Sequence, residues 1–432
     1  MENTLKRAES LVEIYNMFMP KHLTRDQLGF YHKTAAVRDG AHYEFYLDLY
    51  KSIQTNNSFA KLLVVGHLGC GKSTELQMLR AMMSNDNLAD VYINASDDLD
   101  LFGLTYIDLL VLLVEKIVEY AKENNLSVDR HILASFEEVL KTKITSSYWE
   151  ADGGVSVEAS ASAKVSVPFF LEIVSKIKTT LKIASGAKEV LRKEYEPKAR
   201  DIIAAINALI VDLSAQSARK FVVIIDGLER GRQEAVNTLF TKDIAFLSDI
   251  KTHLILGCPI STYRSIDVKT IKSYFLAPVT IPMIKTHNKD RTPYSDGIKT
   301  IESLLLKRVD ATFFEDDVLT TIITKAGGNL RDTFYLVSQC AFEAYMRERT
   351  TVDMDSVNFT LRKFTFDTFM SVPSTSYARA KKIYEGDHTV TQEKELEDLL
   401  YTGAALEYNG ERWVDLAPLV REYVDKNPGI LG

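Results

Sequence analysis

A glycine-rich segment beginning at Gly66 has the residue types and spacing of a phosphate-binding loop. The segment reads GHLGCGKST, fits the pattern G-x-x-x-x-G-K-[ST] and stands between an apolar run and an amphipathic stretch. In such a loop, backbone N–H groups turn toward the phosphates, Lys72 neutralises β- and γ-phosphate charge, and Ser73 offers its hydroxyl to Mg²⁺. The motif predicts binding of ATP with Mg²⁺. The expected contact residues are Gly66, His67, Gly69, Cys70, Gly71, Lys72, Ser73 and Thr74.

A second acidic element follows the apolar run at 221–225. Asp226 ends this run, so its carboxylate is expected at the carboxyl edge of a central strand, beside the phosphate loop. We expect Asp226 to act with Ser73 as a metal ligand; a structural Asp at a strand end is the alternative. Glu229 follows three residues later and is suited to orient an attacking water. The alternative is that Glu229 is an ordinary surface residue of the loop.

A third candidate is Arg331, in the segment GGNLRD at 327–332. Glycines stop one helix, Asn329 caps the next, and Arg331 stands in its first turn. A cation is unfavourable at a helix N-terminus, so Arg331 calls for a compensating anion. A bound phosphate would serve, and an ion pair with an acid such as Asp316 is the alternative.

Short apolar runs alternate with helical patterns ahead of residue 285. This alternation predicts a parallel sheet covered on both faces, hence a three-layer α/β core over residues 31–285. The expected strands lie at about 62–66, 91–94, 221–225, 253–257 and 279–283.

The rest of the chain reads as helical, apart from one hairpin near the C-terminus. Residues 1–30 predict an N-terminal helical arm and residues 286–348 a helical lid. Residues 352–428 are helix-rich and contain Asn409-Gly410 between two apolar and aromatic runs, the strongest short signal for a β-hairpin. Helices followed by one such hairpin predict a C-terminal winged-helix domain.

An insertion is expected at about 150–200. Residues 153–167 alternate at period two and predict a small hairpin or edge strand. The helical segment 168–200 is rich in basic residues, six of which lie between 176 and 193. It is either an arm that faces a partner or nucleic acid, or an ordinary solvated helix face. These cations are Lys176, Lys178, Lys182, Lys188, Arg192 and Lys193.

The segments GHLGCGKST, FVVIIDGLER and GGNLRD, in this order and ahead of a winged helix, resemble the AAA+-type P-loop ATPases. The similarity is strongest to their bacterial initiator-like and STAND-like branch. This resemblance implies that Arg331 is a lid arginine that reads the γ-phosphate. The usual adjacent Asp-Glu pair is missing because Gly227 follows Asp226, so the resemblance moves the catalytic carboxylate to Glu229 and implies slow turnover. It also implies an arginine supplied by a neighbouring subunit, with Arg230, Arg232 and Arg264 as candidates.

Composition excludes several classes of protein. The 432 residues include 52 Lys+Arg and 59 Asp+Glu, a net charge of −7. This charge argues against a protein whose whole surface binds nucleic acid. The helix expected at 391–401 is acidic, so any DNA contact is not expected through it. The three cysteines form no metal or disulfide pattern, and no segment has the length and hydropathy of a signal peptide or membrane span. We therefore expect a cytoplasmic protein without a membrane contact.

The leading hypothesis is an ATP-hydrolysing molecular switch that forms homo-oligomers and regulates a partner protein or effector, with a role in bacterial anti-phage defence. One alternative is an ATP-dependent DNA-transaction factor for loading, transposition or partition. Another is a nucleotide-binding scaffold that does not hydrolyse ATP.

Overall fold

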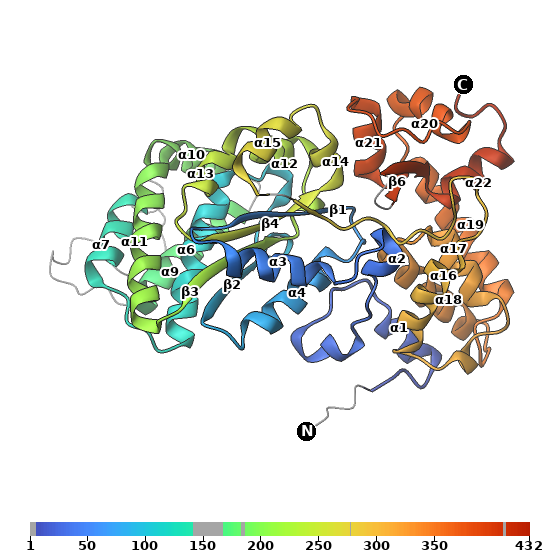
Figure 1. Cartoon of the computed structure of the whole chain (residues 1–432), viewed down its shortest axis with the longest axis horizontal. Coiled ribbons are helices and arrows are strands. Elements are labelled where there is room, and N and C mark those ends of the chain that lie inside the picture. The colour runs from blue at the N-terminus through green and yellow to red at the C-terminus, as the bar shows by residue number, and fades with distance from the viewer. Residues whose placement is uncertain (1–5, 141–166, 183–185, 277, 409–411) are drawn as a thin grey trace.

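Figure 1 shows a computed structural model of the chain. The structure describes residues 6–140, 167–182, 186–276, 278–408 and 412–432. The hairpin expected at 153–167 lies outside them except for Val167, which begins a helix, and so does the expected turn at Asn409-Gly410. The molecule is elongated, with an α/β core at one end and the lid and C-terminal region at the other (Figure 1).

The core contains a five-stranded parallel sheet in the order β2-β3-β4-β1-β5. In β3 every residue after Lys220 is buried, and β4 is buried throughout, as expected when helices cover both faces. The five strands predicted from the sequence are confirmed, with β5 shorter than expected. They are β1 (Lys61–Gly66), β2 (Leu88–Asn94), β3 (Lys220–Asp226), β4 (His253–Pro259) and β5 (Val279–Thr280).

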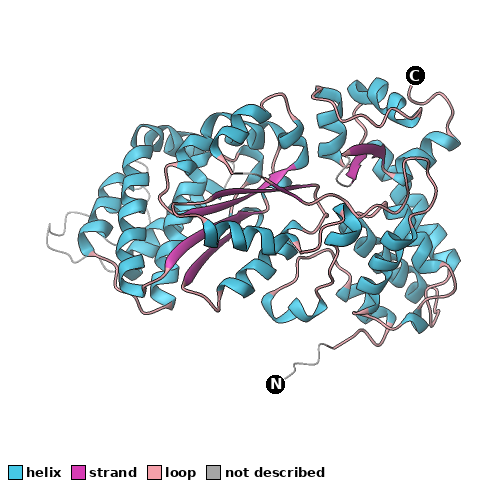
Figure 2. Ribbon diagram, viewed as in Figure 1, coloured by secondary structure: helices cyan, strands magenta, loops and turns pink. Residues whose placement is uncertain are grey.

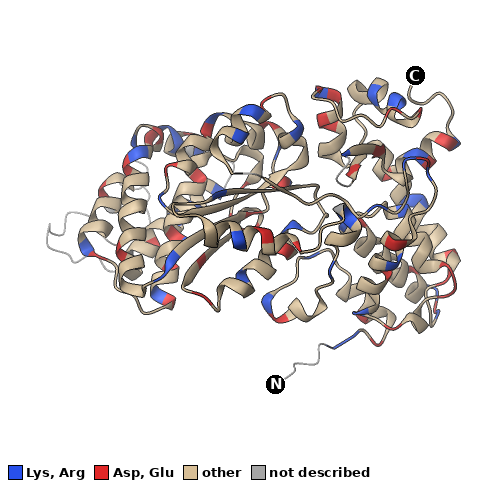
Figure 3. Ribbon diagram, in the orientation of Figure 1, with Lys and Arg blue, Asp and Glu red and all other residues tan. Residues whose placement is uncertain are grey.

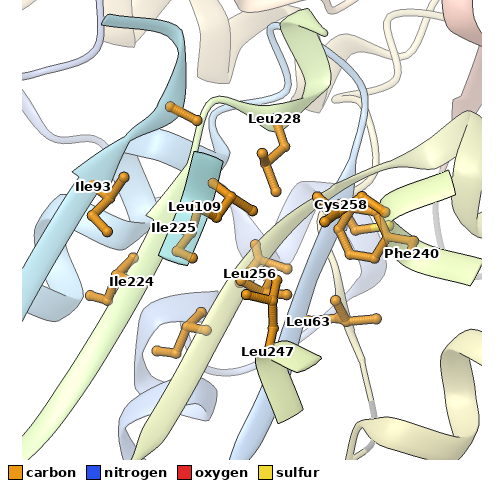
Figure 4. Packing of buried hydrophobic residues seen from close by; sticks show 14 of the residues in the cluster. Leu63, Ile93, Leu109, Ile224, Ile225, Leu228, Phe240, Leu247, Leu256 and Cys258 are labelled. Carbon is orange, nitrogen blue, oxygen red and sulfur yellow. The ribbon is translucent and has the colours of Figure 1, made fainter. Parts of the chain in front are cut away.

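Helices pack on both faces of the sheet and confirm the three-layer α/β arrangement (Figure 2). In Figure 4, Leu109 and Leu247 gather with Ile225 and Leu256 of the central strands. Burying each such side chain contributes roughly 1.5–3 kcal/mol, which holds the strand ends in place. One helix group is α3 (Phe45–Thr55) and α4 (Lys72–Met83); another is α6 (Tyr106–Glu123), α11 (Ala199–Ser217) and α13 (Ile244–Ser248). Further core helices are α2 (Ala35–Asp39), α5 (Ala95–Asp98), α7 (Arg130–Leu140), α12 (Gln233–Thr238), α14 (Ile260–Arg264) and α15 (Val268–Tyr274).

The basic segment 168–200 forms α9 (Val167–Lys182) and α10 (Gly186–Tyr195), and α9 packs against α6. Several of its cations bond within the chain. Lys178 pairs with Glu115 at 2.8 Å, Lys188 pairs with Asp100 at 2.6 Å, Arg192 pairs with Asp108, and Lys182 donates to the Asp97 carbonyl at 2.8 Å. Lys178, Lys188 and Arg192 therefore do not form a free basic face toward a partner, while Lys182 stays exposed. Along the ribbon as a whole, acidic and basic residues are interspersed (Figure 3).

The lid core is built from three helices together with the N-terminal helix α1 and residues of α19 (Met354–Met370), the first helix of the C-terminal region. Leu11, Ile14 and Phe18 from the N-terminal segment are buried among the lid residues. α17 ends at Gly327, whose φ of 63° suits glycine, and α18 begins where the Asn329 side chain accepts the backbone N–H groups of the next turn. The helices are α1 (Leu11–Met17), α16 (Ser295–Leu306), α17 (Val318–Ala326) and α18 (Leu330–Met346).

The C-terminal region contains four helices and an antiparallel hairpin. Strand pairing runs from Ala405 opposite Leu416 to Tyr408 opposite Trp413, which confirms the predicted hairpin strands. Trp413 is buried and stacks on Tyr408 with ring centroids 4.8 Å apart, so it anchors the hairpin as expected. The elements are α19 (Met354–Met370), α20 (Tyr377–Tyr384), α21 (Lys394–Thr402), β6 (Ala405–Tyr408), β7 (Trp413–Leu416) and α22 (Pro418–Lys426). Within the described part of the chain, every helix is too short or too polar to span a bilayer.

Candidate nucleotide-binding site

The phosphate loop joins the end of β1 to the start of α4, and its glycines are sterically required. Gly69 and Gly71 have φ angles of 88° and 105°, which L side chains rarely adopt. A Cβ on Gly69 would lie 2.1 Å from Oδ1 of Asn329, in the lid. On Gly66 it would lie 2.6 Å from Sγ of Cys70. The loop therefore forms a close-packed cradle that the lid touches directly.

Lys72 is buried at the start of α4, with its ammonium group turned into the loop. Its Nζ donates to the carbonyl oxygens of Gly66 at 3.0 Å and His67 at 2.9 Å. The same Nζ lies 3.5 Å from Oε1 of Glu229. Burial alone would lower the pKa of Lys72, but the charge of Glu229, with smaller contributions from Cys70 and Asp226, raises it above its usual value. The lysine is therefore a fixed cation.

Asp226 lies at the carboxyl end of β3 and is buried. Its Oδ2 accepts a hydrogen bond from the Tyr92 hydroxyl at 2.9 Å, and its Oδ1 accepts the Gly227 N–H at 2.8 Å. Burial raises the pKa of Asp226, and the nearby charge of Glu229 adds to the effect. Hydrogen bonds from Ser73 and Tyr92 oppose this shift.

The donor set fits Mg²⁺ held together with a nucleotide. Among the described residues, no group of three or more His, Cys, Asp or Glu side chains is arranged to hold a metal ion alone. Mg²⁺ commonly uses one or two protein oxygens plus substrate phosphates and water, and Ser73 with Asp226 supplies that pair. Ser73 lies close enough to Asp226 to lower the pKa of that carboxyl.

Glu229 stands on the short turn Leu228–Arg230 that follows β3, and only 7% of its side chain is exposed. While Oε1 faces Lys72, Oε2 is buried without a hydrogen-bond partner. An unpaired buried carboxylate oxygen is unfavourable by about 1–3 kcal/mol or more, so it favours a donor such as water at that position.

A pocket over the loop brings most of the predicted residues together, but Gly66, His67, Cys70 and Asp226 are not among the residues that line it. It is lined by Lys72, Ser73, Glu229 and Arg331, and also by residues of the N-terminal segment 20–34. Arg331 is exposed, and its guanidinium forms no ion pair within the described part of the chain, so the alternative pair with Asp316 is not formed. The cavity measures about 130 Å³, which is below the roughly 300–1,000 Å³ typical of small-molecule sites. A nucleotide would have to move the lid or the N-terminal segment.

His67 was expected at the nucleotide, but its side chain turns the other way. Its Nε2 accepts the backbone N–H of Glu407, in β6, at 2.9 Å. Burial, with the charges of Lys72 and Arg264, lowers the pKa of His67 to about 3, so the imidazole is neutral. Only the backbone of His67 remains available to phosphates; its side chain joins the loop to the C-terminal hairpin.

The three candidate arginines differ in accessibility. Arg264 is buried, and its Nε donates to Oε2 of Glu407 at 2.7 Å, so it is not presented to a neighbouring subunit. Arg230 is exposed at the pocket and donates to Oγ of Ser96 at 3.1 Å. Arg232 is exposed and pairs with Glu234 at 2.8 Å.

Arg38 was missed by sequence reasoning. It is buried behind the loop, where its guanidinium donates to the Cys70 carbonyl at 2.7 Å, to Oγ1 of Thr34 at 2.9 Å and to the Pro282 carbonyl. It thereby ties the loop to the chain after β5. No spacing pattern connects Arg38 with the loop, which follows about thirty residues later, so the sequence alone offers no signal.

A parallel sheet in the order β2-β3-β4-β1-β5, a phosphate loop after β1 and an acid at the end of β3 together define an AAA+-like P-loop NTPase. Residues 43–256 match the model of the KAP family P-loop domain. This stretch of the chain is a P-loop NTPase domain of the KAP family.

Comparison with solved structures finds distant similarity over most of the chain. The ORC1 protein of Aeropyrum pernix in complex with DNA is 12% identical, covering 89% of this chain and 92% of that one, with a TM-score of 0.39. Cdc6p from Pyrobaculum aerophilum is 13% identical, covering 88% of this chain and 92% of that one, with a TM-score of 0.36. The Thermotoga maritima RuvB branch migration motor is 13% identical, covering 94% of this chain and 98% of that one, with a TM-score of 0.35. Similarity this distant does not bear on what the chain binds. A search of curated proteins found no match.

Proposed function

We propose that the protein is an Mg²⁺-dependent ATPase in which nucleotide at the phosphate loop controls the docking of the C-terminal hairpin. The observation that carries this proposal is the hydrogen bond from the Glu407 N–H to Nε2 of His67, a residue of the loop itself. The hairpin thus contacts the segment that would wrap the phosphates.

The hairpin is attached to both sides of the pocket. On the core side, the Glu407 carboxylate pairs with Arg264 of α14, and its carbonyl accepts the Met283 N–H at 3.3 Å. On the lid side, the Tyr408 hydroxyl donates to the Gly327 carbonyl at 2.8 Å. If the lid moves relative to the core, the hairpin cannot keep its contacts to both, so one set must change.

The side chains support ATP hydrolysis as the chemistry. Lys72 and Arg331 supply positive charge at opposite walls of the pocket, and Glu229 offers a carboxylate oxygen to position an attacking water. Ser73 and Asp226 would hold Mg²⁺, which supplies charge neutralisation at the phosphates when bound. The pair between Glu229 and Lys72 must loosen as phosphate approaches, which agrees with slow turnover.

Assembly and partner regulation belong to the same proposal. Arg230 and Arg232 are exposed on the loop after β3, so either could reach a site on a neighbouring copy. We propose that copies of the chain assemble through such a contact to act on an effector protein, with bacterial anti-phage defence as the setting.

Phosphate release at increasing protein concentration tests the catalytic part of the proposal. The expected result is a Lys72-dependent rate that rises per subunit with concentration and falls in Arg230→Ala or Arg232→Ala. Lys242→Ala, which removes one exposed positive charge outside the pocket, serves as a charge-matched control. No release from the wild-type protein at any concentration would leave only a nucleotide-binding scaffold.

A further inference from the structure

A second cleft lies between the core and the C-terminal region, separate from the phosphate loop. Its volume is about 780 Å³, within the roughly 300–1,000 Å³ of small-molecule sites. Tyr263 and Lys272, from α14 and α15, line the core side, while His388, Arg412 and Trp413 line the C-terminal side. A molecule in this cleft would touch both parts of the protein.

The cleft is positively charged in a chain whose net charge is −7. None of the described residues that line it is acidic. Lys272 is exposed, lies 5.5 Å from the centre of the Tyr263 ring and forms no ion pair with a described carboxylate; Arg412 is likewise exposed and unpaired among those residues. Two further cations line the cleft: Arg264, whose charge is already matched by Glu407, and Lys289, which has an interaction of its own within the chain. Lys272 and Arg412, on opposite walls, therefore face the cleft with no matching anion in the described part of the chain.

Other polar groups complete the lining. Nδ1 of His388 donates to the Val414 carbonyl at 2.8 Å, which fixes the ring at the wall of the cleft. The exposed side chain of Gln392 adds an amide donor. Ammonium, guanidinium and amide groups converging on one cavity are the donor set of phosphate recognition.

We propose that this cleft binds a small anion bearing two or more phosphate groups, held between Lys272 on the core and Arg412 on the hairpin side. The volume is that of a small-molecule site, and the neighbouring helix α21 begins with Glu395 and Glu397 in its first turn, which would repel a long phosphate backbone. Such a ligand would link the two parts of the protein at the Arg264–Glu407 contact.

The test is a calorimetric titration with inorganic pyrophosphate as the probe. Full-length Lys72→Ala is the parent protein, because it weakens binding at the phosphate loop and isolates the cleft whether or not the chain hydrolyses ATP. Lys272→Ala with Arg412→Ala is added in one variant. Lys269→Ala with Lys382→Ala is added in the control, which removes the same charge from α15 and from the C-terminal region outside the cleft.

The expected result is one pyrophosphate site in the parent and the control, weakened by about tenfold or more in the cleft variant, because charge-assisted hydrogen bonds are lost. Equal affinity in the cleft variant and the control would overturn the proposal, as would no binding to the parent. A parallel arm uses a short DNA duplex. Duplex binding that depends on Lys272 and Arg412, without pyrophosphate binding, would assign the cleft to nucleic acid instead.

Discussion

At the scale of single residues, Glu229 combines features rarely found together outside a functional site. Its side chain is nearly buried, one oxygen lies 3.5 Å from Lys72 Nζ, and the other has no hydrogen-bond partner. A carboxylate held only for stability would use both oxygens. The position therefore fits a group whose second partner is a reactant.

Glu229→Gln is predicted to slow phosphate release by about 10²–10⁴-fold while ATP binding is kept, because the amide preserves the shape but is a poor base. Single-turnover phosphate release and nucleotide binding by fluorescence would be measured side by side. Glu234→Gln is the control, since that side chain is 76% exposed. A wild-type rate in Glu229→Gln would remove this residue from the chemistry.

Glu75, in α4, should give the protein a measurable pH dependence of stability. Burial raises the pKa of this carboxyl from its usual 4.5 to about 7, against the opposing hydrogen bonds from Tyr31 and from the Tyr46 N–H. Between these pH values the folded protein holds a proton that the unfolded chain releases. Stability attributable to Glu75 is therefore full at low pH and is lost as pH rises toward 7.

In Glu75→Gln this loss should be absent. We expect the difference in unfolding free energy between wild type and variant to change by up to about 3 kcal/mol between roughly pH 4.5 and pH 7.5, since one pKa unit corresponds to about 1.4 kcal/mol. Urea unfolding of both proteins across this range measures it. Taking the difference cancels groups common to both, such as His67. A difference that does not vary with pH would show that the pKa of Glu75 is the same in the folded and unfolded protein.

Gly69→Ala should damage the site more than its backbone angle alone requires. The added methyl would meet Asn329 Oδ1 at 2.1 Å, so the loop and lid would have to separate. Gly403→Ala is the matched control: its φ of 76° is similarly strained, but nothing lies within 4 Å of the new Cβ. We expect both variants to lose about 1 kcal/mol in urea unfolding from strain, and only Gly69→Ala to lose nucleotide affinity as well. Equal nucleotide affinity in the two variants would contradict the close contact between loop and lid.

At the scale of elements, β6 is the piece that connects the loop, the core and the lid. Its residue Glu407 is 2% exposed, and its carboxylate is paired with the buried Arg264. A buried pair is of uncertain net benefit, but removing one partner leaves the other charge uncompensated. Removing either partner of the Arg264–Glu407 pair is therefore expected to destabilise the docked hairpin.

Glu407→Gln is predicted to lower the free energy of unfolding by about 3 kcal/mol, because Arg264 keeps its charge without a buried carboxylate. Glu422→Gln provides the comparison. It removes a partly exposed carboxylate that pairs with Lys325 and Lys426, and we expect a loss below about 1 kcal/mol. Similar losses in the two variants, measured by urea unfolding, would mean that the hairpin is not anchored by Glu407.

The elements could be predicted from sequence much more fully than the contacts between them. Strands such as β3 are apolar runs of the right length, and the loop, lid cap and hairpin carry short patterns with direct physical causes. Arg38 and Glu407 carry no such pattern, because their roles arise when distant segments meet. The ion pair between Lys178 and Glu115 could not be predicted either, since Glu115 precedes Lys178 by more than sixty residues.

At the scale of the whole molecule, the site is assembled from parts that need not move as one body. The loop and carboxylates belong to the core, Arg331 belongs to the lid, and the hairpin is bonded to both through Glu407 and Tyr408. The small cavity over the loop implies that nucleotide binding separates some of these parts. Since the hairpin spans the separation, its docking should depend on the nucleotide.

Hydrogen–deuterium exchange of the β6 and β7 amides is the most direct measurement of this coupling. Glu229→Gln would be compared with Mg·ATP and with Mg·ADP bound, and His67→Ala, which lacks the acceptor for the Glu407 N–H, would be run in parallel. We predict faster exchange in β6 and β7 with ATP than with ADP, and no such difference in His67→Ala. Identical exchange in both nucleotide states, with binding of each confirmed, would contradict control of the hairpin by the phosphate loop.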